Sequence, residues 1–171
     1  MTVRSTQPPS PARPNFAKGY GISTSPDGLM SWEWVDQQMT RARNYWIGST
    51  RPNGAPHIAP VWGVWLDGAL YFGGDSQARR TRNLLADPRV VAHLESGDEV
   101  VIIEGVVERV MDSELIGRIE RANATKYGMP EPDPDATPDP TAVVWFRVVP
   151  HVVFAWLERD YPRTATRWVF E

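Results

Sequence analysis

Two glycines, a serine and two adjacent arginines lie close together in residues 73–80, and these residue types could bind an anion. Gly73 and Gly74 leave backbone amides accessible, Ser76 is placed to cap a following helix, and Arg79 and Arg80 supply guanidinium groups. Proteins use such amides, helix N-termini and guanidinium groups to hold phosphate. The segment therefore indicates a phosphate site, although a solvated basic helix after a glycine turn would have the same composition.

The strand-like residues 56–66 precede this turn and carry two residues that a regular central strand avoids. Pro60 has no backbone N–H to donate to a neighbouring strand, and Gly63 has no side chain to pack against the sheet. Such a strand could present backbone polar groups to a flat heterocycle while Trp62 covers it, but Trp62 and Trp65 could equally be core residues. The Asp67-Gly68 hairpin signal leads the chain back to the glycine-arginine turn. A ring along the strand and a phosphate at the turn would then belong to one ligand.

These segments, taken together, resemble the flavin/deazaflavin oxidoreductase superfamily. This is the pyridoxamine 5′-phosphate oxidase-like FMN-binding split barrel, and the resemblance is strongest to its actinobacterial branch that uses coenzyme F420. It covers roughly residues 30 to 171, and each piece is weak alone while the combination is specific. The pieces are residues 45–54 (YWIGSTRPNG), 56–65 (PHIAPVWGVW), 71–73 (YFG), 79–84 (RRTRNL), 93–98 (HLESGD) and 166–168 (TRW).

The resemblance implies a homodimer with a cofactor site in each of two grooves between the subunits. It places the deazaflavin or flavin ring along six consecutive residues and the phosphate at the glycine-arginine turn. Many relatives have lysine where Arg80 stands, a change that keeps the charge. The ring residues are His57, Ile58, Ala59, Pro60, Val61 and Trp62; the phosphate residues are Ser76, Arg79 and Arg80, beside Gly74 and with Asn83 nearby.

The resemblance leads to the prediction of an F420-dependent oxidoreductase. It would transfer a hydride between the deazaflavin and a small molecule, and the eight tryptophans favour a hydrophobic, conjugated one. The alternatives are an FMN-dependent enzyme of the same fold and a non-catalytic protein that binds the cofactor or a tetrapyrrole. Hydride transfer needs a positioned ring more than a protein nucleophile. The sequence identifies no catalytic residue.

Composition excludes several other classes of function. A net charge of −3 and a pI near 5.6 argue against nucleic acid as a partner. The chain has no cysteine, and its three histidines are scattered without ligand spacing, so no metal site is expected. No apolar run is long enough for a membrane span, and the N-terminus lacks a signal-peptide core. We therefore expect a cytoplasmic protein.

The strands and helices that must position the site are predicted from hydrophobic periodicity and from turn and capping residues. Short strands at hairpin spacing, with helices inserted between them, favour an antiparallel split β-barrel of about six to seven strands with a few short helices. Strands are expected over residues 45–50, 56–66, 69–73, 90–95, 100–110, 143–149 and 151–157, with an alternating pattern near the C-terminus. Helices are expected after Ser31, after Ser76 and after Asp112 or Ser113.

Proline content suggests how the chain is divided. Residues 1–28 contain five prolines and few large apolar residues, so we expect an extended or disordered arm. Residues 29–171 form the cofactor-binding domain. Residues 130–140 (PEPDPDATPDP) are expected to form an acidic loop away from any anionic cofactor tail.

Overall fold

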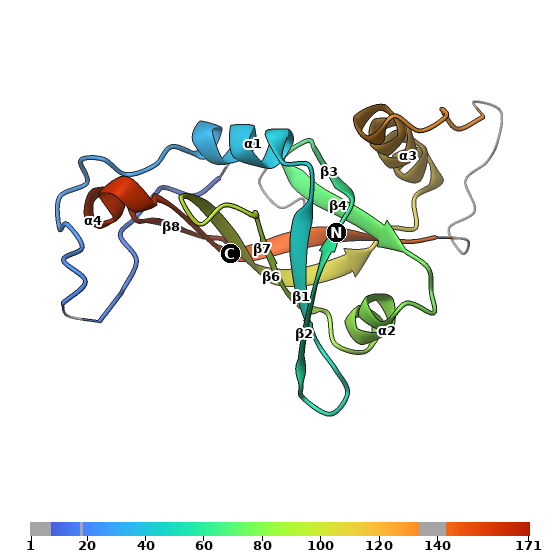
Figure 1. The fold of residues 1–171 in the computed structure, drawn as a ribbon, viewed down its shortest axis with the longest axis horizontal. Helices are drawn as coiled ribbons and strands as arrows, with labels where there is room; N and C mark the ends of the chain where they lie inside the picture. The colour runs from blue at the N-terminus through green and yellow to red at the C-terminus, as the bar shows by residue number, and fades with distance from the viewer. Residues whose placement is uncertain (1–7, 18, 134–142) are drawn as a thin grey trace.

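The computed structural model describes residues 8–17, 19–133 and 143–171, and most of them belong to one antiparallel sheet. The predicted fold class is confirmed: the protein is mainly β, a half-barrel with short helices (Figure 1). The elements in chain order are α1 (Trp32–Arg41), β1 (Tyr45–Thr50), β2 (Pro56–Val61), β3 (Gly63–Leu66), β4 (Ala69–Gly74), α2 (Arg79–Ala86), β5 (Arg89–His93), β6 (Glu99–Arg109), α3 (Ser113–Tyr127), β7 (Val144–Leu157), a short 3₁₀ helix (Glu158–Asp160), α4 (Tyr161–Thr164) and β8 (Thr166–Val169).

The strand order explains why the sheet curls. Along the sheet the strands run β2-β1-β5-β6-β7-β4-β3, and β8 pairs with β7. Only Trp62 separates β2 from β3 in the sequence, yet these strands stand at opposite ends of the order. The sheet must therefore bend until its two edges approach each other at Trp62. This is the split of the barrel.

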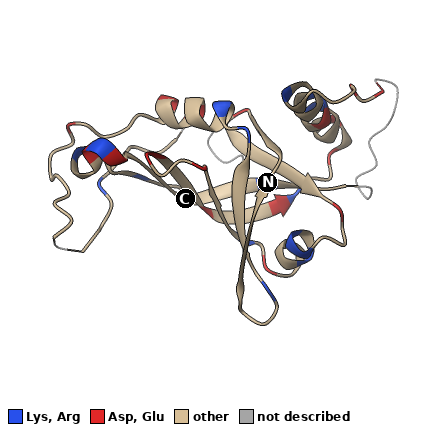
Figure 2. Ribbon diagram, in the orientation of Figure 1, with Lys and Arg blue, Asp and Glu red and all other residues tan. Residues whose placement is uncertain are grey.

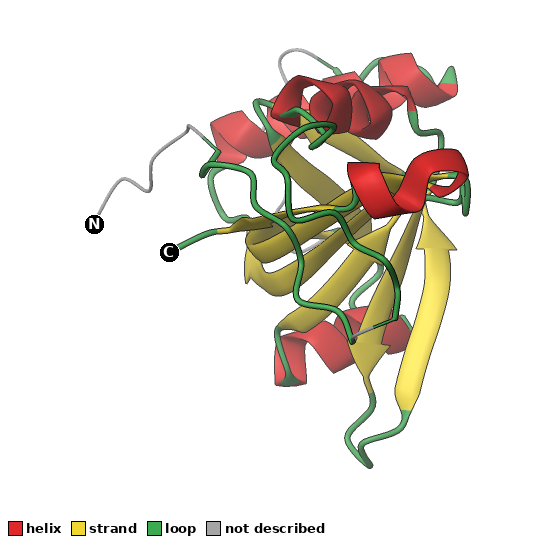
Figure 3. Cartoon of the chain, turned by 90° about the vertical axis from the view of Figure 1, so that its left-hand side faces the viewer, coloured by secondary structure: helices red, strands yellow, loops and turns green. Residues whose placement is uncertain are grey.

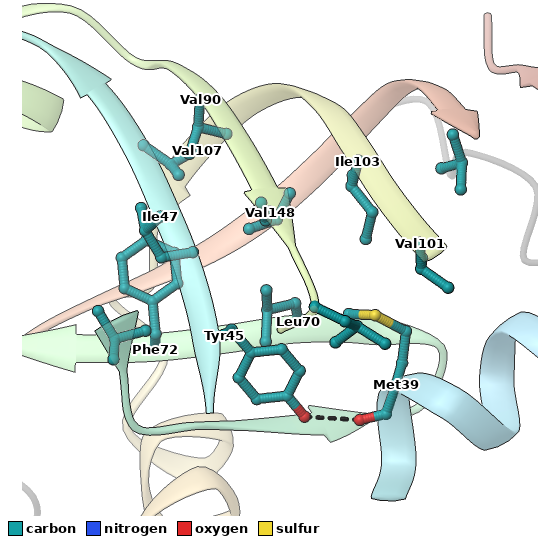
Figure 4. Close-up of a cluster of buried hydrophobic side chains, with 14 of the residues drawn as sticks. Met39, Tyr45, Ile47, Leu70, Phe72, Val90, Val101, Ile103, Val107 and Val148 are labelled. Atoms are coloured by element: carbon teal, nitrogen blue, oxygen red, sulfur yellow. Dashed lines mark hydrogen bonds between the residues drawn. The ribbon is translucent and has the colours of Figure 1, made fainter. Parts of the chain in front are cut away.

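Helices α1 and α2 close the barrel from two sides (Figures 1 and 3). The main core lies inside the curled sheet, where Val35 and Met39 of α1 and Leu84 of α2 join side chains from the strands. Figure 4 shows part of this cluster, including the Tyr45 hydroxyl that donates to the Met39 carbonyl oxygen at 2.7 Å. Burial of these side chains anchors α2, and with it the glycine-arginine turn.

Helix α3 packs on the outside of the barrel. Ile116 and Ile119 form a second cluster with Val64, Tyr71 and Trp145 of the sheet. The carboxylate of Asp112 accepts from the amides of Glu114 and Leu115, so Asp112 is the N-cap that the sequence offered. Gly128 ends the helix with φ 66°, a left-handed conformation that suits glycine.

Two strand predictions are wrong in their boundaries. The expected strand over residues 56–66 is two strands, because the chain changes partner from β1 to β4 at Trp62. The expected strands over 143–149 and 151–157 are one strand, β7, because a bulge at His151, opposite Glu104 and Gly105 of β6, keeps the ladder continuous past Pro150.

The described part of the N-terminal segment lies against the C-terminal elements. Ala12 and Arg167 exchange backbone hydrogen bonds at 2.9 and 2.8 Å. The Arg13 guanidinium donates to carbonyl oxygens of Ser25, Asp27, Arg163 and Ala165. The boundary at residue 28 stays a prediction, and positions 134–140 of the expected acidic loop lie outside the described residues.

Candidate functional site

Strand β2, where the ring was expected, is an edge strand whose side chains alternate in exposure. Ile58 is 55% exposed and its neighbours on that face, Pro56 and Pro60, are also exposed, whereas His57 and Ala59 are half-buried and Val61 is buried. The strand pairs with β1 on one side, and none of the described residues pairs with its other side. Both the apolar face and the free edge of β2 are thus open to a ligand or to another chain.

Trp62 stands at the split of the barrel with 49% of its surface exposed. One face of its indole stacks on Tyr127 of α3, with ring centroids 4.3 Å apart and planes within 4° of parallel. This stack fixes the orientation of an exposed aromatic ring at the end of β2. Trp62 is therefore a surface aromatic rather than a core residue, whereas Trp65 packs against the main core.

The turn between β4 and α2 does not have the predicted helix cap at Ser76. Ser76 is not the N-cap of α2; that position belongs to Ala78, and no side chain caps the helix. The reason is a tight turn at Asp75, whose backbone oxygen accepts from the Ala78 amide at 3.0 Å and whose carboxylate accepts from the Gln77 amide at 2.6 Å. The helix starts two residues later than Ser76 would allow. Its first amides are consequently left without a side-chain partner.

Arg80 lies folded over this turn. It donates from Nη2 to the Gly73 oxygen at 3.1 Å, its Cζ lies 5.8 Å from the centroid of Phe72, and burial lowers its pKa. A Cβ on Gly74 would lie 2.9 Å from Arg80 Nη2 and 3.0 Å from Thr81 Oγ1, so only glycine leaves both groups in place. Arg80 Nε and Thr81 Oγ1 are buried without a hydrogen-bond partner among the described residues.

Unpaired buried donors are uncommon, and each costs about 1 to 3 kcal/mol when no partner is present. Arg80 Nε carries part of a positive charge, so the partner it lacks is an acceptor and preferably an anion. Figure 2 shows that α2 carries basic residues and no acidic one. The residues present therefore fit a phosphate group.

His57 connects the open strand with the basic turn. Burial lowers the pKa of His57, and the positive charges of Arg51, Arg80 and Arg79 lower it further. Three guanidinium groups thus act on one imidazole, and they come from the β1–β2 turn and from the start of α2. The predicted ring strand and the predicted phosphate turn share one electropositive region.

Asn83 has a different place from the other phosphate residues. Its side chain is buried and donates from Nδ2 to Ser49 Oγ at 3.2 Å, and Ser49 Oγ lies 3.5 Å from His57 Nδ1. This chain of contacts crosses from α2 through β1 to β2. Asn83 therefore holds the helix and His57 in a fixed relation from inside the fold.

A cavity of about 400 Å³ lies between α3 and the adjacent ends of β4 and β7, and sequence reasoning missed it. Asn123 and Trp145 line it, and each has a buried polar atom, Asn123 Oδ1 and Trp145 Nε1, with no partner among the described residues. The available signal was Asn123 itself, a polar residue on the buried stripe of α3 beside Ile116 and Ile119. The other lining residues are Trp62, Gly73, Gly74, Glu120, Ala124, Met129, Pro130, Pro132 and Val143.

Lys126 and Tyr127 fasten α3 to the split of the barrel. Lys126 Nζ donates to the Gly63 oxygen at 2.8 Å and to the Tyr45 hydroxyl at 3.0 Å, and it lies 4.5 Å from the Tyr45 ring centroid. The Tyr127 hydroxyl accepts from the Gly63 amide at 2.9 Å. These bonds satisfy the backbone of Gly63 where the strand changes partner. Burial, and then the charge of Arg43, lower the pKa of Lys126 to about 8.

We expect the Lys126→Met variant to differ from the wild type in how stability depends on pH. Between about pH 8 and pH 10 the folded chain has released the Lys126 proton while the unfolded chain, with an ordinary lysine pKa of 10.5, still holds it. The unfolded state then binds more protons, so wild-type stability rises with pH in this window. The variant should lack this rise. Urea unfolding of both proteins at about pH 7 and about pH 9.5 measures it, and identical pH profiles would contradict the assignment.

Two further features of the described residues concern the class of site. None of the helices in the described part of the chain could span a membrane. No group of three histidine or acidic side chains in the described ranges could hold a metal ion.

Comparisons with known proteins give a consistent result. A family model described as pyridoxamine 5′-phosphate oxidase matches residues 32–157. The conserved hypothetical protein Rv2991 from Mycobacterium tuberculosis is 26% identical, with a TM-score of 0.68 over 81% of this chain and 91% of that chain. No curated protein is a significant match to the sequence.

Two more distant structures share the fold. One, an F420 reductase, is 21% identical with a TM-score of 0.55 over 69% of this chain and 94% of that chain. The General Stress Protein 26 from Bacillus anthracis is 19% identical, with a TM-score of 0.57 over 72% and 91%. The family model covers most of the chain, including the whole segment from β2 to α2, and oxidoreductases that use flavin-type cofactors are among its members. The chain therefore belongs to the pyridoxamine 5′-phosphate oxidase family.

Proposed function

We propose that this protein is an oxidoreductase that uses coenzyme F420 and transfers a hydride between the deazaflavin and a hydrophobic, conjugated small molecule. The observation that carries the proposal is the electropositive region of Arg51, Arg79 and Arg80 around His57, with the unpaired Nε of Arg80 beside it. A structure titled F420 Reductase shares the fold, which supports F420 as the first cofactor to test.

The residues have separable roles in this proposal. Arg79, Arg80 and the uncapped amides at the start of α2 hold the phosphate, because guanidinium groups and helix N-termini both favour an anion. Strand β2 offers its free backbone edge to the ring, and Trp62 limits the access of water at the end of that strand. When bound, the deazaflavin supplies the hydride-carrying ring. The protein contributes position and exclusion of water rather than a nucleophile.

FMN is the alternative cofactor. Both the family, which includes proteins with flavin-type cofactors, and the phosphate residues of the site are compatible with it. The phosphate residues would suit either molecule, since both carry a phosphate on the flexible chain attached to the ring. F420 differs by its anionic oligoglutamate tail, which would need cations beyond the phosphate residues. Arg82 on the exposed side of α2 is such a cation. Arg163 is not near it, because Arg163 pairs with Asp160 and lies on α4, at the opposite end of the sheet from α2 (Figure 1).

We further propose that the protein acts as a homodimer, with each cofactor groove completed by the partner. Support comes from the exposed apolar residues of the sheet, Ile58 on β2 and Val91 on β5. A hollow of about 440 Å³ lies beside Val91, between β1 and the bulge at His151 of β7. A second copy would cover this face and the free edge of β2 together.

Cofactor binding tests the proposal directly. We expect the purified chain to bind F420 more tightly than FMN, because only F420 can use cations outside the phosphate site. Fluorescence quenching of each cofactor measures affinity, and transfer from the reduced cofactor to a panel of conjugated acceptors measures turnover. Tight FMN binding without F420 binding would show that the cofactor is FMN and not F420. F420 binding without turnover on any acceptor would favour a carrier of the cofactor.

A further inference from the structure

The cavity between α3 and the ends of β4 and β7 lies on the other side of β4 from the phosphate turn. Gly74 faces Arg80 and Thr81, whereas a Cβ on the neighbouring Gly73 would lie 2.9 Å from Trp145 and Val143. Successive residues of a strand point to opposite faces, so the two sites share one strand end without sharing side-chain partners. Gly73 lets the Trp145 indole reach the strand and form a wall of the cavity.

Two unpaired polar atoms distinguish this cavity from a packing defect. Asn123 is 9% exposed and Trp145 is 7% exposed, and both side chains line the cavity. Neither Asn123 Oδ1 nor Trp145 Nε1 has a hydrogen-bond partner within the described ranges. Buried polar side-chain atoms in native proteins are nearly always paired. Their presence beside an open volume indicates that a ligand supplies the missing partners.

The chemistry of the two atoms defines the ligand. The amide oxygen of Asn123 accepts a hydrogen bond and therefore needs an N–H or O–H donor. The indole N–H of Trp145 only donates and needs an acceptor oxygen or nitrogen. A molecule that carries both an N–H donor and a carbonyl acceptor, such as a lactam, would supply both partners.

The remaining walls agree with a flat and mostly apolar molecule. They include Trp62, whose ring is already held by Tyr127, and the small or apolar residues Ala124 and Val143. Glu120 is the charged residue among the described lining residues, and its carboxylate would repel a phosphate or carboxylate group. The anionic part of a cofactor is therefore unsuited to this cavity, and the volume of about 400 Å³ is within the range of small-molecule sites.

We propose that this cavity binds the hydride-exchange partner of the enzyme, a planar, uncharged molecule whose lactam-type edge pairs with Asn123 and Trp145. The role of the ligand as hydride-exchange partner rests on the proposed function. The pairing of the ligand with Asn123 and Trp145 does not depend on that function. Trp62 lies at the end of the ring strand and also lines the cavity, so the bound molecule would lie next to the ring position.

Isoquinolin-1(2H)-one is a suitable probe because it is planar and carries a lactam N–H beside its carbonyl. Calorimetry with the full chain, free of cofactor, gives its affinity for the wild type and for Asn123→Leu and Trp145→Phe. We expect each variant to bind the probe about tenfold more weakly, as for one lost hydrogen bond. The N-methyl derivative lacks the donor, so its affinity should not change in Asn123→Leu. Two independent variants keep the test valid if one of them unfolds.

A second titration separates the substrate from the cofactor, whose ring has a similar edge. The probe is titrated into the wild type saturated with F420 or FMN, whichever binds. Unchanged probe affinity supports the proposal, whereas loss of probe binding would assign the cavity to the cofactor ring and overturn it. Equal probe affinity in the wild type and both variants would also overturn it. If neither cofactor binds but the variants still discriminate, the proposed function fails and the lactam site stands.

Discussion

Replacing Arg79 and Arg80 together with alanine is expected to weaken cofactor binding by about 3 kcal/mol, roughly a hundredfold. Arg79 is exposed at the first position of α2 and is free to turn toward an anion, whereas Arg80 is held over Phe72 with an unpaired Nε. Both charges act on His57 and so face the same region. Fluorescence titration with F420, or with FMN if that is the ligand, measures the loss.

The matched control for this experiment is Arg118→Ala. Arg118 is a surface cation of α3 that pairs with Asp67 at 2.6 Å, at the hairpin end of β4 opposite the phosphate turn. Its removal changes the net charge without touching the site, so affinity should remain within about twofold of the wild type. Affinity should also fall less steeply with salt in the double variant, because fewer charges are paired with the ligand. Unchanged affinity in the double variant would show that residues 73–80 are only a solvated helix start.

Local signals in the sequence were sufficient for the parts of the fold that depend on local chemistry. The Asp67-Gly68 hairpin forms with both residues at positive φ, 51° and 73°, and joins β3 to β4 as predicted. Asp112 caps α3 because its side chain can reach the first free amides without help from the rest of the chain. Ser76 offered the same signal and failed, because the neighbouring Asp75 makes the competing turn.

The split at Trp62 could not be predicted because its cause lies in distant residues. Val61 is the last residue that pairs with β1 and Gly63 is the first that pairs with β4. The backbone of Gly63 is held by Lys126 and Tyr127, more than sixty positions away in the chain. A Cβ at Gly63 would lie 2.7 Å from the Tyr71 oxygen, so glycine is required by close approach of two strands. The sequence shows the glycine but not the strand that approaches it.

The two parts of the candidate site differ in the same way: one depends on local sequence and the other on the packing of distant elements. The phosphate turn is a continuous segment whose residues each indicate anion binding, and it could be proposed from the sequence. The cavity beside Trp145 depends on α3 docking across β4 and β7, and its polar atoms come from residues 123 and 145. Two residues of different elements that share no motif give no pattern to recognise. Only the packing of α3 brings them together.

Gly105→Ala is expected to destabilise the fold by about 3 kcal/mol, the largest stability effect among the predictions. Gly105 of β6 pairs with Pro150 of β7 next to the bulge at His151, and a Cβ there would overlap the Val149 carbonyl oxygen. The clash is with backbone on a ladder that spans the whole barrel, so no flexible side chain can move to relieve it. The ladder itself would have to shift, together with the bend that lets β7 continue past Pro150.

The matched control is Gly48→Ala on β1, in the same sheet. A Cβ at Gly48 would lie 3.5 Å from the Val91 oxygen, an ordinary van der Waals contact, and its φ is compatible with alanine. We expect this variant to stay within about 0.5 kcal/mol of the wild type. Urea unfolding of the three proteins gives both differences. Equal stability of the two variants would mean that β6 tolerates a side chain opposite the β7 bulge, and that the curvature of the barrel does not depend on glycine at position 105.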